Sequence, residues 1–212
     1  MSDAPERSIS QAALKQQIAT TAQARHDPGG SRSFPLAVGV VGDAIFSPCQ
    51  RYRHALMREW PVLLASKARP ALFIGMNPST ADAMRDDPTC KREQGFARRE
   101  NCTQYIKVNV MDYRATYPLD LRELGVVPRS DTNLSWIRRF AQHTRDLNGF
   151  AVAAWGVIHA DLKHYTDEAL AVLRATGVEL LCLGVSLSGA PRHPLYQPAD
   201  AKLVPFLGGV QS

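Results

Sequence analysis

The chain has 212 residues, of which 45% are apolar and 21% charged, and its formal net charge is +5. This composition predicts a globular protein with one core, and no stretch approaches the roughly 18 consecutive apolar residues of a membrane span. The N-terminus lacks the apolar region of a secretory signal, so we expect a cytoplasmic protein that does not associate with membranes. The positive charge is compatible with nucleic acid as a partner and equally with no charged partner.

The first part of the chain is rich in Ala, Gln, Ser and Arg and ends in a Gly- and Pro-containing cluster at 26–31. Because Gly and Pro mark flexible junctions, we predict a flexible tail over residues 1–33, with one helical piece near 11–22. A single α/β domain is expected to follow over residues 34–212.

Two strand-like segments open this domain. Residues 36–46 and 51–60 flank the turn signal Ser-Pro-Cys-Gln at 47–50. The pattern predicts an N-terminal β-hairpin.

From residue 71, short apolar runs alternate with longer amphipathic stretches, which is typical of parallel strands joined by crossover helices. Helix-end signals lie between the runs: Asp87 and Pro88 begin a helix that reaches about Glu100, Asp131 caps a second, and Gly177 ends a third. The predicted architecture is a three-layer α/β sandwich with a central four-stranded parallel sheet, in addition to the hairpin. The expected strands are 71–74, 105–110, 150–155 and 178–183.

The unusual residues lie at or just past the predicted strand ends. In an open parallel sheet, ligands bind at the carboxyl ends of the strands. Here four loops, at 75–80, 109–114, 155–156 and 184–196, follow those ends. The sequence therefore predicts one site where these loops meet.

The loop after the first of these strands reads Gly-Met-Asn-Pro-Ser-Thr. Gly75 lets a backbone approach closely, Pro78 fixes the turn, and the Asn77 amide can orient a water or a ligand edge. The alternative is a strand-ending turn in which Asn77 bonds its own backbone. Asn77 is a candidate catalytic residue, and the candidate substrate contacts in this loop are Gly75, Met76, Pro78, Ser79 and Thr80.

His193 is the best candidate among the six histidines for an acid, a base or a hydrogen-bond donor, because the Gly-containing approach at 188–191 would hold it in a defined loop. The adjacent carboxylates Asp86 and Asp87 can supply a general base. Since Asp87 is more simply the cap of the following helix, Asp86 is the third candidate catalytic residue.

Other loop residues are candidate substrate contacts. Arg114 can meet a phosphate or a carboxylate, or form a surface salt bridge of small energetic value. The aromatic residues can stack on a nucleobase or belong to the core, and core packing is favoured for Trp155. These further candidates are Tyr113, Arg114, Trp155, Arg192 and Tyr196.

Pairs of basic residues on the predicted helices, at 91–92, 98–99 and 138–139, can contact phosphates or simply form solvated faces. No Walker loop, dinucleotide-binding fingerprint, zinc-protease motif, nucleophile elbow or EF-hand pattern is present. The four cysteines show no metal-ligand spacing. We therefore predict neither a cofactor nor a metal.

Five motifs occur in order along the chain: R-Y-R-x-x-L-x-R-x-W at 51–60, F-I-G-M-N-P-S-T-A-D at 73–82, D-D-P-T at 86–89, G-F-A-R-R at 95–99 and G-x-P-R-H-P-L-Y at 189–196. Together they resemble the bacterial domain of unknown function 1643 family over about residues 36–206. This resemblance implies no established activity.

A more distant resemblance is to the uracil-DNA glycosylase-like superfamily. It is carried by the order of a strand, a G-x-N-P-x loop, a strand with Asn and then a basic residue, a strand ending in Gly near an aromatic residue, and a last strand followed by His-Pro. The resemblance implies that Asn77 holds the hydrolytic water and that Asn109 reads the base edge. It also implies that His193 donates to the base carbonyl as negative charge develops.

The leading hypothesis that this resemblance implies is an N-glycosidic hydrolase of glycosylase-like fold, acting on a nucleobase-containing small molecule or on nucleic acid. A second hypothesis is a non-catalytic nucleotide or nucleic-acid-binding module that keeps the pocket. A third is an enzyme acting on an unrelated small metabolite, whose anionic group Arg114 and Arg192 would hold.

Overall fold

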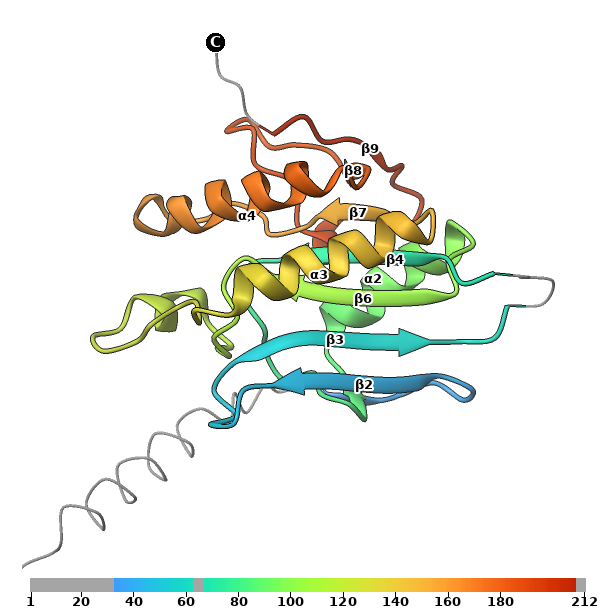
Figure 1. The fold of residues 1–212 in the computed structure, drawn as a ribbon, viewed down its shortest axis with the longest axis horizontal. Helices are drawn as coiled ribbons and strands as arrows, with labels where there is room; N and C mark the ends of the chain where they lie inside the picture. The colour runs from blue at the N-terminus through green and yellow to red at the C-terminus, as the bar shows by residue number, and fades with distance from the viewer. Residues whose placement is uncertain (1–32, 63–66, 209–212) are drawn as a thin grey trace, which may run out of the picture.

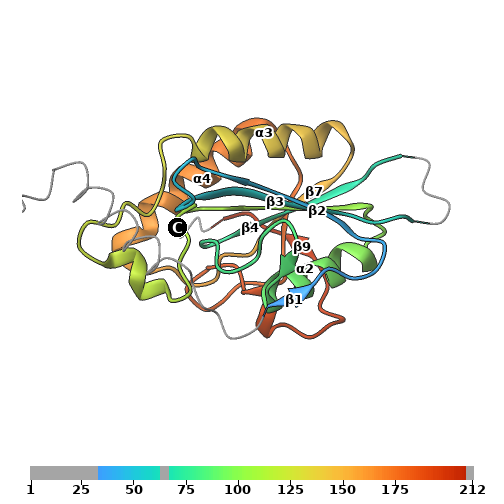
Figure 2. The same cartoon turned by 90° about the horizontal axis from the view of Figure 1, so that it is seen from below.

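The computed structural model describes residues 33–62 and 67–208. A central sheet runs through this part of the chain, with helices on both faces (Figures 1 and 2). The predicted tail up to residue 32, including its helical piece, lies outside the described residues. The strands are β1 (Phe34–Pro35), β2 (Val41–Phe46), β3 (Arg53–Glu59), β4 (Pro70–Gly75), β5 (Arg85–Asp86), β6 (Gln104–Asn109), β7 (Phe150–Ala153), β8 (Leu180–Cys182) and β9 (Val204–Pro205). The helices are α2 (Pro88–Arg99), α3 (Asn133–Asp146) and α4 (Lys163–Thr176), with short 3-10 helices η1 (Pro118–Arg122), η2 (Ala160–Leu162) and η3 (Pro194–Tyr196).

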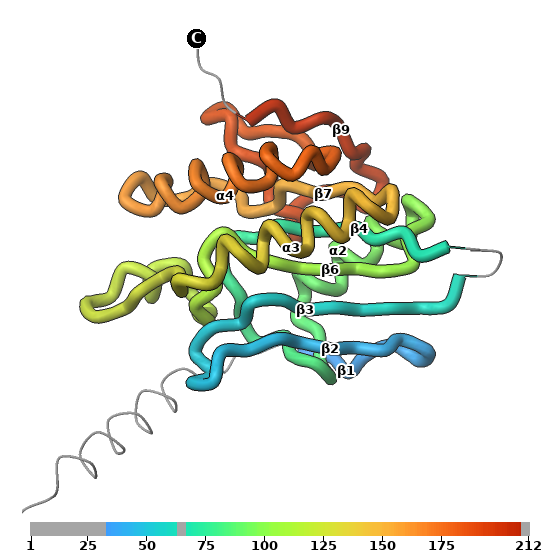
Figure 3. Tube along the Cα trace, viewed as in Figure 1, coloured from blue at the N-terminus to red at the C-terminus, as the bar shows by residue number. Residues whose placement is uncertain are grey.

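The main sheet has seven strands in the order β2-β3-β6-β4-β7-β8-β9. Within it β6, β4, β7 and β8 pair in parallel, whereas β2, β3 and β9 are antiparallel to their neighbours. The four strands expected to be parallel thus lie side by side, but inside a larger mixed sheet. The predicted hairpin is part of that sheet, because β3 lies beside β6 (Figure 3). Their pairing places Leu56 opposite Lys107.

The helices divide between the two faces of the sheet. Figure 2 shows α3 and α4 on one side and α2 on the other. Alternation along β6 points Ile106 and Val108 into the core beneath α3 and α4, and Tyr105 and Lys107 toward α2. No helix in the described ranges is long and apolar enough to cross a membrane.

Two of the three predicted helix-end signals are confirmed. The Asp87 side chain accepts the N–H of Cys90 at 2.7 Å, with Pro88 as the first residue of α2. Gly177 ends α4 in the left-handed conformation at φ 71°. The predicted cap at Asp131 is wrong: Thr132 is the N-cap and makes no side-chain capping bond. Asp131 lies in the preceding turn, which the N–H of Asn133 closes onto the carbonyl of Ser130.

The predicted start of the hairpin at residue 36 is also wrong. The N–H of Val40 donates to the carbonyl of Ala37 and closes a turn, so β2 begins only at Val41. The chain before this turn pairs elsewhere, because β1 is antiparallel to β5 in a separate two-stranded sheet.

The basic side chains of α2 make internal contacts. Arg99 donates to the carbonyl oxygens of Ala199 and Ala201, each at 2.7 Å, and Arg92 donates to that of Gln197. Arg98 lies 3.9 Å from the ring centroid of Trp60. The bonds of Arg92 and Arg99 fasten the segment 197–201 to α2, while Arg98 and Arg99 remain exposed.

Candidate functional site

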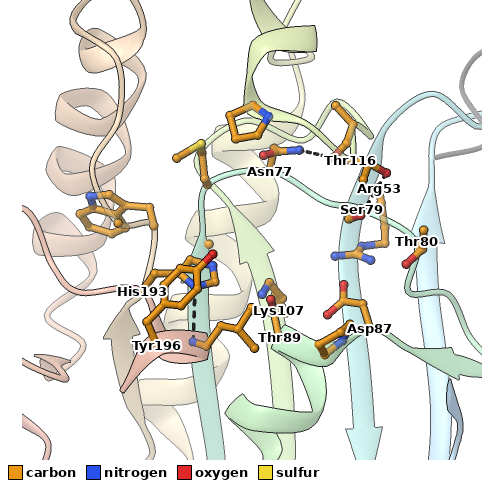
Figure 4. A pocket seen from close by; sticks show the side chains of 18 of the residues that line it. Arg53, Asn77, Ser79, Thr80, Asp87, Thr89, Lys107, Thr116, His193 and Tyr196 are labelled. Carbon is orange, nitrogen blue, oxygen red and sulfur yellow. Dashed lines mark hydrogen bonds between the residues drawn. The ribbon is translucent and has the colours of Figure 1, made fainter. Parts of the chain in front are cut away.

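A cavity of about 510 Å³ opens at the carboxyl ends of β4 and β7. Figure 4 looks into it. The loop after β4, the N-terminus of α2 and the loop that carries η3 all contribute to its walls. The lining residues are Arg53, Gly75, Met76, Asn77, Ser79, Thr80, Asp87, Pro88, Thr89, Lys107, Ala115, Thr116, Pro118, Trp155, Gly156, Val157, His193, Leu195 and Tyr196.

One end of the cavity has an aromatic wall. β7 ends at Ala153, short of the predicted residue 155, and the Trp155 side chain lines the cavity. Trp155 is also part of the core, since it is 2% exposed and packs edge-on against Phe206 with centroids 5.6 Å apart. Tyr196 is 77% exposed, and its ring centroid lies 5.5 Å from that of His193. Such a wall suits a flat ring in the ligand.

His193 is held as a neutral hydrogen-bond donor. Its Nδ1 accepts the N–H of Leu195 at 3.3 Å, so the proton of the neutral ring lies on Nε2. Burial and the nearby Lys107 ammonium lower the pKa of His193 to about 4. At neutral pH the ring therefore offers one N–H to the cavity.

The Asn77 side chain is fixed by two carbonyl groups. Its Nδ2 donates to the oxygen of Ala115 at 2.7 Å and to that of Pro78 at 3.1 Å. One of these bonds is local, to the next residue, and the other is long-range, so the side chain is held by more than the turn considered above. No described residue donates to Oδ1, which leaves this oxygen available to a water or a ligand.

Gly75 is required by close packing beneath the loop. A Cβ at this position would lie 2.7 Å from Asn109 Oδ1 and 3.0 Å from Lys107 Cε. Asn109 is opposite Gly75 in the β4–β6 pairing and is fully buried, and within the described residues neither its Oδ1 nor its Nδ2 has a partner. The Asn109 side chain lies behind Gly75 and does not line the cavity.

Lys107 places a buried cation at the floor of the cavity. Its Nζ lies 2.9 and 2.8 Å from Glu93 Oε1 and Oε2, and Oε2 also accepts the Tyr105 hydroxyl at 2.6 Å. Burial alone would lower the pKa of Lys107, but the Glu93 carboxylate raises it above its usual value. The ammonium therefore stays charged beneath His193 and favours its neutral form.

Arg53 reaches the same cavity because the hairpin contains an irregularity. The register between β2 and β3 shifts at residues 45–46, which leaves His54 as an extra residue in β3. His54 stacks on Trp136 of α3, while Arg53 turns to the opposite face of the sheet. Arg53 is fully buried, and the one hydrogen bond of its side chain in the described structure runs from Nη1 to the carbonyl of Ala81 at 2.6 Å.

Asp87 is the carboxylate that lines the cavity. Its Oδ1 accepts the N–H of Cys90 at the start of α2. Burial would raise the pKa of Asp87, but the charge of Lys107, the N–H of Cys90 and the charge of Arg53 together hold it below its usual value. Asp87 is therefore ionised and combines capping with a place in the cavity.

The neighbouring Asp86, which we expected to be the general base, does not fit that role. It is buried outside the cavity lining, and its carboxylate accepts Arg58 Nε at 3.0 Å and Gln94 Nε2 at 2.8 Å. These two donors make Asp86 a buried partner of β3 and α2. Of the two adjacent carboxylates, Asp87, which caps α2, is the one that faces the cavity.

The structure brings together part of the predicted site. Tyr113 packs edge-on against Tyr52 in a separate core cluster, with centroids 5.5 Å apart. Arg114 lies 5.1 Å from the ring centroid of Phe46. The predicted residues that line the cavity are Gly75, Met76, Asn77, Ser79, Thr80, Trp155, His193 and Tyr196. Those that do not are Pro78, Asp86, Asn109, Tyr113, Arg114 and Arg192.

Hydrogen bonds within its own loop hold the Arg192 side chain away from the cavity. Its N–H donates to the carbonyl of Gly184 at 2.9 Å, and its Nε donates to that of Val185 at 3.2 Å. These bonds hold Arg192 against the start of the loop after β8, so Arg192 and Arg114 do not form the anion clamp considered above.

Sequence reasoning missed the two cations of the site. Lys107 interrupts the apolar run of β6, and a charge inside a buried strand is a signal that it must have a partner or a ligand. Arg53 gave no comparable signal, because its strand already carries other charged residues.

A family model described as a protein of unknown function (DUF1643) matches residues 53–195. The match covers more than half of the chain and runs from Arg53 past His193, so it includes most of the cavity lining. A comparison with curated proteins gave no match.

Proposed function

The chain belongs to the family described as a protein of unknown function (DUF1643), and we propose that it hydrolyses the N-glycosidic bond of a nucleobase-containing substrate. The observation that carries this proposal is the neutral His193, whose Nε2–H is left for a ligand in a cavity that Asn77 and Asp87 also line. The sequence resemblance to the uracil-DNA glycosylase-like superfamily supports the same reaction.

In the proposed reaction, the bond between the sugar carbon and the base nitrogen breaks, and its electron pair leaves with the base. Negative charge then develops on the base, and the Nε2–H of His193 stabilises it at a carbonyl oxygen. The Lys107 ammonium adds a positive potential from the floor of the cavity. A neutral donor suits this role because it keeps its proton while it stabilises the departing anion.

The sugar cation that remains is captured by water. Asn77 Oδ1 accepts one hydrogen bond from this water, and the ionised Asp87 takes the proton that the water loses. The departing base gains a proton from solvent, so the net reaction is hydrolysis to free base and sugar hydroxyl. The aromatic wall of Trp155 and Tyr196 would hold the base while the bond breaks.

The proposal is tested by incubating the full chain with DNA, RNA, nucleosides and nucleotides and measuring released free base by mass spectrometry. Release by the wild type that disappears in Asp87→Asn would assign the activity to this cavity and not to a contaminant. Arg138→Met, on the exposed side of α3, is the matched control and should retain it. Saturable binding with no base released from any substrate would instead favour the non-catalytic binding module.

A further inference from the structure

We propose that the buried end of the cavity holds the phosphate of a nucleoside monophosphate, so that the ligand is a free mononucleotide. The inference begins from Arg53. Its Nε and Nη2 are buried without a hydrogen-bond partner in the described structure. The nearby Asp87 carboxylate, whose pKa Arg53 helps to lower, makes neither a hydrogen bond nor an ion pair with it. Because buried charges are normally paired and hydrogen-bonded, the unbonded Nε and Nη2 of Arg53 indicate a binding site for an anion.

A second arginine of the same strand shows what a purely structural role looks like. Arg58 is equally buried, and its Nε donates to Asp86 at 3.0 Å. Its Nη1 donates to the carbonyl of Met57, and its Nη2 donates to those of Asp82 and Arg85. Every nitrogen of Arg58 is thus satisfied. Arg53 differs from it in lining the cavity and in keeping two nitrogens unbonded.

The groups around Arg53 match a phosphate. Figure 4 shows its guanidinium among Ser79, Thr80 and Asp87, and the hydroxyl-bearing Thr89 lines the same cavity. Guanidinium and hydroxyl donors bind phosphate oxygens, and the N-terminus of α2 adds a favourable dipole. The Asp87 carboxylate at this end stays the base of the proposed reaction, and the charges of Arg53 and Lys107 offset its repulsion of the phosphate.

The two ends of the cavity fit the two ends of a mononucleotide. In Figure 4, His193 and Tyr196 lie toward one side and Arg53 and Thr80 toward the other, with Lys107 between them. The base would lie at the aromatic wall and the phosphate at Arg53, which places the sugar near Lys107. A volume of about 510 Å³ is in the usual range for a ligand of this size.

The approach to the cavity does not suit a nucleic acid chain. Among the lining residues only Arg53 and Lys107 are basic, and both are buried at its base. The exposed lining residues Pro118, Val157, Leu195 and Tyr196 are uncharged. A flipped nucleotide in DNA needs cations along its flanking phosphates, whereas a free mononucleotide needs them only inside.

The assignment of the base end rests on the proposed function, whereas the phosphate end is tested by binding alone. Isothermal titration calorimetry of the full chain would compare ribo- and deoxyribonucleoside 5′-monophosphates with the matching nucleosides, ribose 5-phosphate and inorganic phosphate. We expect at least one monophosphate to bind about tenfold or more tightly than its nucleoside and than either phosphate compound. Equal affinity for nucleoside and monophosphate would overturn the phosphate site. Ribose 5-phosphate or inorganic phosphate binding as tightly as the nucleotide would overturn the nucleotide assignment.

Arg53→Met should abolish the preference for the monophosphate and leave nucleoside binding little changed. Because Arg53 also bonds Ala81, Thr80→Val serves as a second variant, with a smaller expected loss of the same preference. Arg138→Met is the charge-matched control. A folded Arg53→Met, or Thr80→Val where Arg53→Met does not fold, that keeps the full preference would refute the inference. Nucleotide binding without base release would refute only the hydrolase, whereas base release from nucleosides without a phosphate preference would refute only the phosphate site.

Discussion

Lowering the pH is expected to destabilise the fold through His193. In the folded protein, burial and the Lys107 ammonium lower the pKa of this histidine from 6.5 to about 4. As the pH falls below 6.5, the unfolded chain therefore binds a proton that the folded chain does not accept until about pH 4. The stability contributed by the neutral ring is complete above pH 6.5 and is lost as the pH falls to about 4.

The size of the effect follows from the shift. One pKa unit corresponds to about 1.4 kcal/mol, so the change from 6.5 to about 4 gives an upper limit of about 3 kcal/mol for the free energy of unfolding. Carboxylates also titrate toward the acid end of this range, so the wild type alone does not isolate the histidine. His193→Gln is the matched variant, because it is polar and similar in size but takes up no proton.

The assay is urea denaturation, followed by tryptophan fluorescence, at intervals from pH 7 to pH 4. Between these limits the wild type should lose up to about 3 kcal/mol more than His193→Gln. An NMR titration of the imidazole measures its pKa directly. Parallel stability curves for the two proteins, or a His193 signal that titrates near 6.5, would show that the ring is not held neutral as we infer.

Three further predictions concern the site. Gly75→Ala should lower the free energy of unfolding by about 1–3 kcal/mol, because the new Cβ would lie 2.7 Å from Asn109 Oδ1. Gly95→Ala, whose Cβ would meet open space, should cause no such loss, and denaturant unfolding of both variants checks this. Asp86→Asn should lower the free energy of unfolding by about 3–5 kcal/mol, because it breaks the buried ion pair with Arg58. Asp87→Asn should still cap α2 but lower base release about 10²–10⁴-fold. Melting temperature and turnover separate these two, and an unstable Asp87→Asn with normal turnover per folded molecule would exclude Asp87 as the base. His193→Ala should reduce turnover by about 10²–10³ with little change in ligand affinity, and a joint loss of binding and melting temperature would indicate a loop-fastening role instead.

The order of strands and helices was accessible from the sequence because its signals are local. Apolar runs, the cap at Asp87 and the glycine at 177 each act within a few residues. The loops after β4, β7 and β8 were therefore placed at one edge, and Asn77 and His193 do line one cavity. The choice between Asp86 and Asp87 was not accessible, because it depends on Arg58, which comes from a distant strand.

Arg114 and Arg192 show a related limit. Both lie in loops at the predicted edge, yet the Arg114 guanidinium lies over Phe46 of the hairpin and the Arg192 Nε bonds the carbonyl of Val185. A position after a strand end fixes where the backbone runs, but the direction of a long side chain depends on partners that the topology alone does not supply.

The irregularity in β3 explains why strand periodicity could not identify Arg53. In an unbroken strand Arg53 would share a face with Ala55, which packs in the core beneath α3 and α4. The register shift turns Arg53 to the α2 face, where Arg58 also lies, although regular alternation forbids this for residues five positions apart. Arg58 is fully bonded there, whereas Arg53 keeps two unbonded nitrogens at a cavity. Because bulges occur next to functional sites and re-aim single side chains, the placement of Arg53 agrees with the phosphate site that we propose.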